Sequence, residues 1–318
     1  MSEFLEKEAI VSTDFQGQRV DVVVAKLFPD FSRSQLSQWL KEGVITLNQR
    51  AYKPKDKVYG GEQVILRVML DDAPGDRHLA EEIPLDIVFE DDSLLIINKP
   101  AGLVVHPGAG NPQHTLVNAL LHHDASLHHI PRAGIVHRLD KDTTGLLMVA
   151  KTLTTHTSLI RQMQARDIQR RYQTLVYGHV ISGDTLETFY GRHPRNRLKM
   201  AVCSQGKEAV TEYTVRKQYD YFTLLDIKLL TGRTHQIRVH MAHINHPVVG
   251  DQLYGGRVRF PAGSTDLLRQ VLQQFKRQAL HACYLSFKHP VTQQQLTFTV
   301  PLPDDFQSLL TALDDYFD

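Results

Sequence analysis

The chain has 318 residues, of which 42% are hydrophobic and 22% charged, and its formal net charge is +1. This length predicts two domains, and the composition is typical of a globular protein rather than a disordered or fibrous one. Two cysteines cannot build a disulfide framework, and the sequence has neither a secretory signal nor a run approaching the roughly 18 apolar residues of a membrane span. We therefore expect a cytoplasmic protein that does not contact a membrane.

The N-terminal quarter of the chain predicts a flexible arm at residues 1–15, followed by a small α+β domain at residues 16–70. Apolar residues at helical spacing predict one helix over Val20–Phe28 and a second after Ser32, a plausible N-cap. Gly43 is expected to end the second helix. The strands expected to complete this domain are residues 44–48 and 63–68.

For the rest of the chain the sequence predicts a linker at residues 71–82 and a large domain at residues 83–318. The linker is polar, acidic and broken by Pro74-Gly75. The large domain has many strands, few helices and no regular βαβ alternation, which predicts a mixed, mainly antiparallel sheet and an α+β fold class. The expected strands are residues 87–90, 94–98, 172–177, 210–215 and 222–229, and the expected helices are residues 115–123 and 154–166.

Charge is segregated along the chain although the total is nearly neutral. Residues 31–57 carry six basic and two acidic side chains, and residues 151–200 carry nine basic and three acidic ones. This pattern suggests a groove for a polyanion, and solvated helix faces explain it equally well from charge alone. A basic loop at residues 192–199 is expected to be exposed and to meet phosphates, because so many cations cannot be buried together.

The most informative segment runs from His137 to Thr143 and lies between the apolar residues 134–136 and 146–150. Charges enclosed by two buried segments are held near the interior, where a carboxylate needs a cationic partner or a chemical role. Asp140 is therefore either a catalytic carboxylate or part of a structural salt bridge or helix cap.

Residues 136–151 carry the pattern His-Arg-Leu-Asp, followed after a short gap by Thr-Gly. They resemble the catalytic signature of the pseudouridine synthases that act on ribosomal and transfer RNA, the family typified by ribosomal large subunit pseudouridine synthase A. Residues 98–108, Arg171-Tyr172 and residues 231–240 resemble its other motifs, in the same order. The resemblance covers residues 13–302 and implies a pseudouridine synthase fold with a central cleft, preceded by an RNA-binding domain of the ribosomal-protein-S-four type.

The resemblance implies that the chain isomerises uridine to pseudouridine in RNA, by breaking the glycosidic bond and reattaching the base through carbon five. Asp140 would be the catalytic carboxylate, and Arg238 would be its cationic partner. Attack on the sugar, attack on the base and proton abstraction from the ribose all remain open. Tyr172 would stack on the uracil and could move a proton, although an isolated strand tyrosine usually belongs to the core. We expect loss of Arg238 to reduce activity more than folding.

Arg138 would enter the space left by the flipped base, and a salt bridge with Asp140 or Asp142 is its alternative role. His235, His240 and His243 lack a cysteine or carboxylate that would complete a metal set, so no metal is predicted. In the first domain the resemblance implies RNA contacts, although a protein-docking module of the same fold is an alternative. The contact positions it implies there are Arg33, Ser34, Gln35, Lys41, Asn48 and Lys53. The other residues predicted to bind RNA are His106, Arg171, Arg192, Arg195, Arg197, Arg233 and His235.

Residues 104–112, 131–137 and 240–247 are shared almost word for word with family members that modify 23S rRNA. This implies 23S rRNA or a precursor of the large ribosomal subunit as the partner, with the helix 69 stem-loop as the substrate. We expect a monomer, and no small-molecule cofactor, since there is no phosphate-cradling or dinucleotide motif. Two alternatives remain: an rRNA-binding ribosome-assembly factor, or a synthase of the same family that acts on another 23S rRNA site or on transfer RNA.

Overall fold

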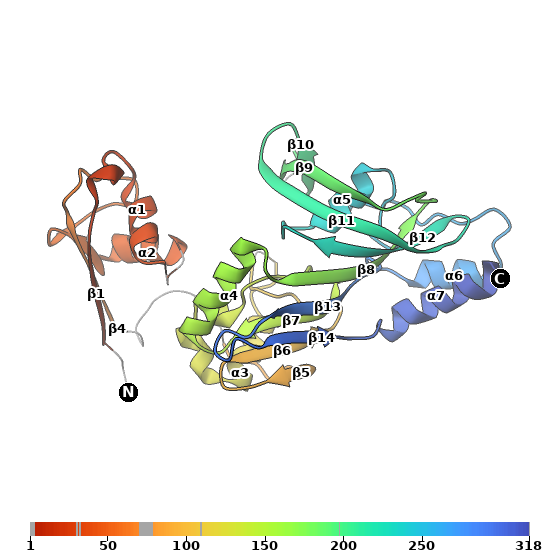
Figure 1. The fold of residues 1–318 in the computed structure, drawn as a ribbon, viewed down its shortest axis with the longest axis horizontal. Helices are drawn as coiled ribbons and strands as arrows, with labels where there is room; N and C mark the ends of the chain where they lie inside the picture. The colour runs from red at the N-terminus through yellow and green to blue at the C-terminus, as the bar shows by residue number, and fades with distance from the viewer. Residues whose placement is uncertain are drawn as a thin grey trace.

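The computed structural model describes residues 4–29, 31, 33–69, 79–108, 110–196 and 198–317, apart from the side chains of Phe4, Ser34, Gln35 and Met69 (Figure 1). Within these ranges the chain forms two sheets, one of four strands near the N-terminus and one of ten strands in the remainder. Most of the predicted linker, and Ser32 with its proposed cap, lie outside the described residues.

The small domain places two helices against a sheet with the strand order β1-β4-β2-β3. Val23, Val24, Leu36 and Trp39 project from the helices and are at most 2% exposed, because each helix turns one apolar stripe toward the sheet. The predicted helices and strands of this domain are confirmed. The strands are β1 (Phe4–Ile10), β2 (Ile45–Leu47), β3 (Arg50–Ala51) and β4 (Gln63–Met69), the helices are α1 (Val20–Leu27) and α2 (Arg33–Glu42), and a 3-10 turn, η1, spans Thr13–Phe15.

The flexible arm expected at residues 1–15 is wrong for the part that the structure describes. Phe4–Ile10 form β1, which pairs antiparallel with β4 along its whole length, and Val11 after it is buried. Leu5, Lys7 and Ala9 turn inward, whereas Glu6, Glu8 and Ile10 are exposed. An edge strand needs only one partly apolar face, so a segment this rich in charge can still form a strand.

The large domain is a single sheet with the strand order β10-β9-β11-β12-β8-β13-β7-β6-β5, in which β14 also pairs with β13. Every described pair is antiparallel except β13 with β7, which confirms the mixed, mainly antiparallel sheet. The five predicted strands and two predicted helices are all present. The strands are β5 (Ile87–Glu90), β6 (Leu94–Lys99), β7 (Thr144–Ala150), β8 (Gln169–Tyr177), β9 (Asp184–Arg192), β10 (Met200–Cys203), β11 (Lys207–Gln218), β12 (Phe222–Leu229), β13 (Leu280–Lys288) and β14 (Gln295–Thr299). The helices are α3 (Leu116–His123), α4 (Leu153–Ala165), α5 (Gln236–His243), α6 (Asp266–Gln274) and α7 (Asp304–Phe317), with 3-10 turns η2 (Ala125–His129) and η3 (Pro131–Gly134).

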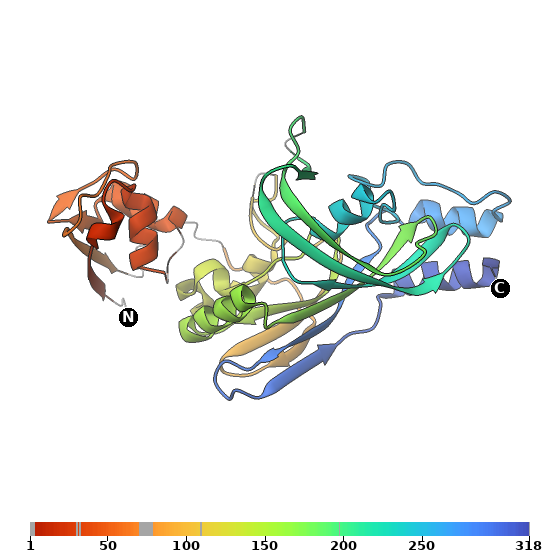
Figure 2. The ribbon, with the colours of Figure 1, turned by 45° about the horizontal axis from the view of Figure 1, so that its top comes forward.

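The sheet divides into two halves that meet at β8 and β13, as the two ribbon views show (Figure 2). Strands β6 and β7 are buried on both faces, because one face joins the main core and the other joins a second core that includes Leu159 of α4. This double burial explains why both strands read as continuous apolar runs rather than as alternating patterns. Residues of the main core are Leu95, Ile97, Leu147 and Val149, and residues of the second are Leu94, Ile96, Leu146 and Met148.

The Thr-Gly pair of the motif begins β7 at the point where this strand runs parallel to β13. Gly145 has a φ of +109°, and a Cβ at this position would lie 2.2 Å from the carbonyl oxygen of Ala282. Only glycine therefore permits this approach of β7 to β13. The approach places the loop of residues 135–143, which precedes β7, at the middle of the sheet.

Candidate active site

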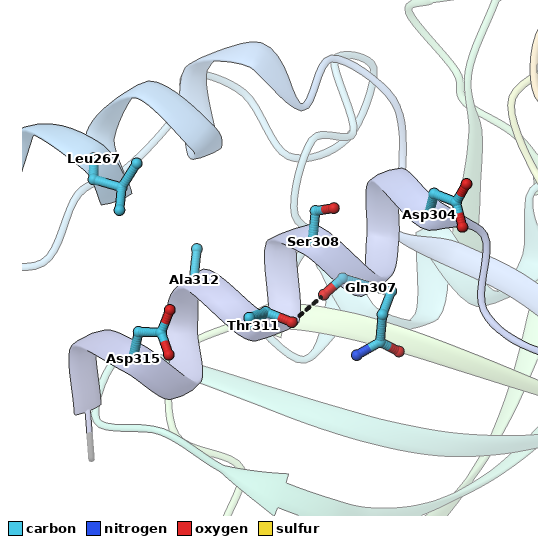
Figure 3. Close-up of a pocket in the computed structure, with 7 residues that line it drawn as sticks. All are labelled: Leu267, Asp304, Gln307, Ser308, Thr311, Ala312 and Asp315. Atoms are coloured by element: carbon cyan, nitrogen blue, oxygen red, sulfur yellow. Dashed lines mark hydrogen bonds between the residues drawn. The ribbon is translucent and has the colours of Figure 1, made fainter.

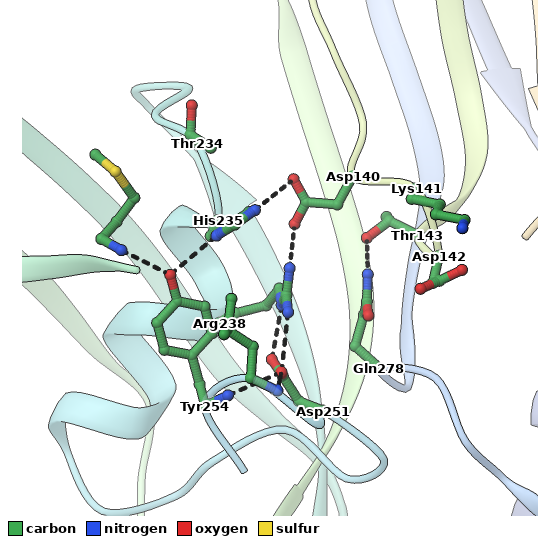
Figure 4. Close-up of polar contacts among 12 residues, drawn as sticks. Asp140, Lys141, Asp142, Thr143, Thr234, His235, Arg238, Asp251, Tyr254 and Gln278 are labelled. Carbon is green, nitrogen blue, oxygen red and sulfur yellow. Dashed lines mark hydrogen bonds and ion pairs between the residues drawn. The ribbon is translucent and has the colours of Figure 1, made fainter. Parts of the chain in front are cut away.

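Asp140 and Arg238, 98 positions apart in the chain, form an ion pair at the middle of the large domain. Arg238 Nη1 donates to Asp140 Oδ2 over 2.9 Å, and the side chains are 8% and 13% exposed. Figure 4 shows that Asp142, the other carboxylate of the loop, lies away from Arg238. The structure thus brings the two predicted residues together and leaves Asp142 out of the ion pair.

Arg238 also pairs with a second carboxylate, Asp251, which was not predicted. Its Nε and Nη2 donate to the two oxygens of Asp251 over 2.6 and 2.9 Å, and the Asp251 side chain is fully buried. Burial works against the charge of Arg238, but the hydrogen bonds to Asp251 and the charge of Asp140 outweigh it and raise its pKa. Arg238 is therefore a permanent cation, held by Asp251 and presented to Asp140 (Figure 4).

Tyr254 and His235 complete one side of this centre. The guanidinium of Arg238 lies over the Tyr254 ring, 5.2 Å from its centroid, and the Tyr254 hydroxyl accepts from Met200 N over 2.9 Å. His235 Nδ1 lies 2.9 Å from that hydroxyl, and its Nε2 lies 3.8 Å from Asp140 Oδ1. Burial lowers the pKa of His235 against the opposing charge of Asp140, so the ring is neutral near pH 7.

Tyr172 lies on β8 opposite Ile227 of β12 and is 4% exposed. Burial raises the pKa of its hydroxyl, Arg170 lowers it and Asp140 raises it further, so the phenol is neutral and lies within the electrostatic reach of Asp140. The structure is therefore compatible with both interpretations of Tyr172, because its side chain belongs to the core and its hydroxyl is within the electrostatic reach of Asp140.

Lys99, Arg277 and Gln278 form hydrogen bonds with the loop that carries Asp140. The Lys99 ammonium is fully buried and donates to the carbonyl oxygens of Pro100, Leu103 and Lys141 over 2.7 to 2.9 Å. Burial lowers the pKa of Lys99 to about 7, although three donated hydrogen bonds require the charged form. Arg277 donates to the carbonyl oxygen of Asp142, and Gln278 donates to the Thr143 hydroxyl over 3.1 Å. These contacts hold the loop in place and so fix the direction in which the Asp140 side chain points.

Comparison with known proteins agrees with this geometry. A model of the RNA pseudouridylate synthase family matches residues 93–243, and an S4 domain model matches residues 18–64. Ribosomal large subunit pseudouridine synthase D of Xylella fastidiosa is 52% identical to the chain and covers 96% of it and 92% of its own length. The protein of the same name from Pseudomonas aeruginosa is 49% identical and covers 98% and 97%. The solved structure of Human RNA Pseudouridylate Synthase Domain Containing 1 is 27% identical, covers 73% of this chain and 89% of its own, and has a TM-score of 0.55.

The chain belongs to the RNA pseudouridine synthase family. It is an isomerase with an S4 domain before its catalytic domain, which confirms the predicted family, fold class and type of reaction.

The synthase presents Arg138 to solvent on the same loop as Asp140. In the part of the chain that the structure describes, Arg138 pairs with neither Asp140 nor Asp142, so the salt-bridge reading is not supported. Its charge contributes to the lowered pKa of His235, so Arg138 lies within electrostatic reach of the Asp140 centre. Arg233 is half-buried, donates to the carbonyl oxygen of Glu208 over 3.0 Å and lines a pocket of about 430 Å³ with Thr234 and Lys207.

Other predicted RNA-binding residues lie on β8, at the end of β9 and in the loop after β6. Arg171 points to the face of β8 opposite to Tyr172, because neighbouring residues of a strand alternate, and its guanidinium lies 4.7 Å from the centroid of the Tyr284 ring. Arg192 and Arg195 are exposed at the end of β9, and His106 is partly exposed in the loop after β6. Arg197 lies outside the described residues.

In the S4 domain, Arg33 is about half exposed and pairs with the buried Asp21 over 2.7 Å. Lys41, Asn48 and Lys53 are exposed, and the Asn48 side chain accepts from Gln63 N. The side chains of Ser34 and Gln35 lie outside the described residues.

No group of histidine, cysteine, aspartate or glutamate residues in the described ranges could hold a metal ion. His240 is fully buried and pairs with the Thr188 hydroxyl over 3.0 Å, which makes it structural. None of the described helices is both long and apolar enough to cross a membrane.

A second pocket, of about 420 Å³, lies between α6 and α7 and is lined by residues such as Leu267, Asp304 and Asp315 (Figure 3). Its lining holds no residue of the Asp140 centre, so it is separate from that centre.

Asp251 and Tyr254 are the main parts of the centre to which the sequence analysis assigned no role. Asp251 and Tyr254 follow the buried residues Val248 and Val249, and a lone carboxylate after an apolar run was the available signal. Nothing in the sequence connects that carboxylate with Arg238, whereas the fold does.

Proposed function

We propose that this synthase isomerises specific uridines of 23S rRNA, in the stem-loop called helix 69, with Asp140 as the essential carboxylate. The observation that carries the chemistry is the pairing of Asp140 with Arg238, which Asp251 holds in turn. The choice of RNA rests on the relatives, whose names describe synthases of the large ribosomal subunit. The partner is then 23S rRNA or a precursor of the large subunit, bound by a monomer.

A carboxylate held by one oxygen keeps its other oxygen for chemistry. Asp140 Oδ2 accepts from Arg238, whereas Oδ1 has only the more distant His235 beside it. In the routes through the sugar, the bond between ribose C1′ and uracil N1 breaks, and its electron pair leaves with the base. Asp140 then either bonds to C1′ or takes the proton of C2′. The neighbouring arginine keeps the carboxylate ionised for either role.

The detached uracil has to be retained until it rotates and bonds to C1′ through carbon five. Tyr172 supplies an aromatic face beside Asp140, and its neutral hydroxyl can donate or accept a hydrogen bond there. The proton that C5 carries must then leave, and one must reach N1, so the reaction consumes no net proton. Arg138, exposed on the catalytic loop, is suited to occupy the space that the flipped base leaves in the RNA.

RNA binding outside the Asp140 centre is assigned to three groups of exposed or partly exposed residues. These are Arg33, Lys41, Asn48 and Lys53 of the S4 domain, Arg192 and Arg195 at the end of β9, and the partly exposed His106 and Arg233 of the catalytic domain. Contacts with phosphates depend on salt, so the affinity for RNA should fall steeply as the salt concentration rises.

Tritium release from RNA that carries 5-tritiated uridine tests the proposal, because the hydrogen at C5 is lost only when C5 bonds to the ribose. Purified synthase is compared on 23S rRNA, on 23S rRNA with cytidines in place of the helix 69 uridines, and on bulk transfer RNA. Asp140→Asn is the inactive variant. Asp142→Asn, which removes the carboxylate that lies away from Arg238, is the matched control.

Release from 23S rRNA that disappears with the helix 69 substitutions and with Asp140→Asn, but persists with Asp142→Asn, supports the proposal. Release from 23S rRNA that survives the helix 69 substitutions moves the target to another site of that RNA. Release from transfer RNA alone overturns the choice of RNA and retains the chemistry. No release from any of these, or from assembling large-subunit particles, leaves an rRNA-binding assembly factor.

A further inference from the structure

Arg170 is a buried arginine beside the catalytic centre that has no anionic partner in the described part of the chain. It is 7% exposed, and its Nε is fully enclosed and has no hydrogen-bond partner. No described aspartate or glutamate forms an ion pair with it, although Asp140 and Asp251 share Arg238. A buried guanidinium without an anion is costly, because burial removes its hydration and nothing replaces it.

The position of Arg170 links it to the centre through two independent features. It precedes Tyr172 by two residues on β8, so both side chains project from the same face of the sheet. It also lies against Gly232 in the loop between β12 and α5, which carries His235. A Cβ at Gly232 would lie 2.7 Å from Arg170 Nη1. The glycine thus provides space for the guanidinium under the loop that leads to Arg238.

The residues around Arg170 do not neutralise it. Burial and the charge of Arg170 lower the pKa of His137 to about 3, so its ring is neutral, and His137 Nε2 accepts from Met148 N over 3.1 Å. His137 Nδ1 then carries the hydrogen, and it too is buried and without a partner. Tyr172 is likewise neutral, because burial raises its pKa. The Arg170 guanidinium and His137 Nδ1 are thus both hydrogen-bond donors without a partner. No described side chain supplies the anion that would accept from them.

We infer that Arg170 is a further catalytic residue, which binds the negatively charged oxygen of the uracil base once its bond to the ribose is broken. This inference rests on the proposed function. When the bond between C1′ and N1 breaks, the electron pair leaves with the base, and the negative charge is shared between N1 and the adjacent carbonyl oxygen. A fixed cation on the same face of β8 as Tyr172 stabilises that charge and retains the base while it turns. The negative charge leaves the base when C5 bonds to C1′, and Asp140 is then a free carboxylate again. The proton afterwards moves from C5 to N1.

The sign of the stability change separates this role from a structural one. Methionine has a similar length and no charge, so Arg170→Met removes an unpaired buried cation and should leave the melting temperature unchanged or higher. The same variant should lower kcat for tritium release about 100-fold and change KM much less, because the contact forms only as the base leaves. Arg170→Lys keeps a cation and should recover part of kcat. Arg216→Met, in which an exposed arginine of β11 is changed, is the matched control and should behave as the wild type.

Three results would overturn the inference. The first is a kcat for Arg170→Met equal to the wild-type kcat, in an assay in which the wild-type synthase releases tritium. Another is a melting temperature lowered by more than about 5 °C in both Arg170→Met and Arg170→Lys with kcat retained, which would assign Arg170 to the frame of the domain. A rise in KM with a lower salt dependence and an unchanged kcat would place a phosphate, and not the base, at Arg170. A wild type that is inactive on every RNA would instead overturn the proposed function, so the two failures are distinguishable.

Discussion

Arg238 and Arg170 are equally buried, at 7% exposed each, and their surroundings are opposite. Arg238 donates to two carboxylates, one of them fully buried, whereas Arg170 has no anionic partner in the described residues. Burial alone therefore does not tell what a charged residue does. A cation with its anions in place belongs to the frame that positions Asp140, and a cation without one is suited to receive charge from a substrate.

The buried histidines of the same domain avoid an uncompensated charge in a third way. Burial lowers the pKa of His240 and of His281 to about 4, so both rings are neutral and need no counter-ion at pH 7. Arginine cannot lose its proton in this way. A buried arginine therefore needs an anion. Arg238 has its anions in the folded protein, whereas by our inference Arg170 meets its anion only when the base becomes charged.

The largest expected effect comes from removing the negative charge of Asp140, which Arg238 holds in place. Asp140→Asn should lower tritium release by about 10⁴-fold or more, because the essential carboxylate is lost. The free energy of unfolding should stay within about 1 kcal/mol of the wild-type value, since Arg238 keeps its two hydrogen bonds to Asp251. Urea unfolding measures the second quantity. A strongly destabilised Asp140→Asn variant would mean that Asp140, and not Asp251, anchors the arginine.

The next prediction tests the buried ion pair of Arg238 with Asp251. Arg238→Met should abolish activity and also reduce the free energy of unfolding by about 3–5 kcal/mol, because it leaves the buried Asp251 without a cation. This revises the expectation that loss of Arg238 harms activity more than folding, which considered only its pairing with Asp140. Adding Asp251→Asn should recover roughly half of the lost stability and none of the activity. An Arg238→Met variant as stable as the wild type would contradict the comparison with Arg170.

The buried histidines should make the domain sensitive to acid. Burial lowers the pKa of His281 to about 4 in the folded protein, whereas histidine in an unfolded chain has a pKa of about 6.5. Below pH 6.5 the unfolded chain binds the proton and the folded one does not, so stability is lost as the pH falls toward 4. Between pH 7 and pH 5 His281 should account for about 2 kcal/mol of lost stability. His281→Asn should reduce that loss by this amount in urea titrations at the two pH values, and an unchanged loss would mean that His281 is protonated in the fold.

The smallest effect is expected at an exposed cation, where solvent replaces a partner. Arg195→Gln should weaken RNA binding only a few-fold and reduce the slope of log affinity against log salt by about 0.9, the value for one phosphate contact. The melting temperature should not change, because the side chain lies in solvent. Filter binding at several salt concentrations gives the slope. An unchanged slope would remove Arg195 from the RNA-binding surface.

Much of the fold could be predicted, because burial leaves a pattern in the sequence. Strands β8, β11 and β12 alternate apolar and polar residues, and α3 and α4 have helical spacing, so each was found. Strand β1 was missed, because an edge strand with one partly apolar face resembles a charged tail. Strand β9 was not predicted either, since most of its residues are partly or fully exposed.

The sequence by itself determined the family: Asp140, Tyr172 and Arg238 stand in motifs that occur in the order typical of RNA pseudouridine synthases. Only the tertiary structure decided how these residues are held. It connects Arg238 with Asp251, the Lys99 ammonium with the carbonyl of Lys141, and Gly232 with Arg170. Each of these contacts joins segments that different strands and loops bring together. Pairing of charges depends on distances of about 3 Å in space, and such distances follow from packing and not from spacing along the chain.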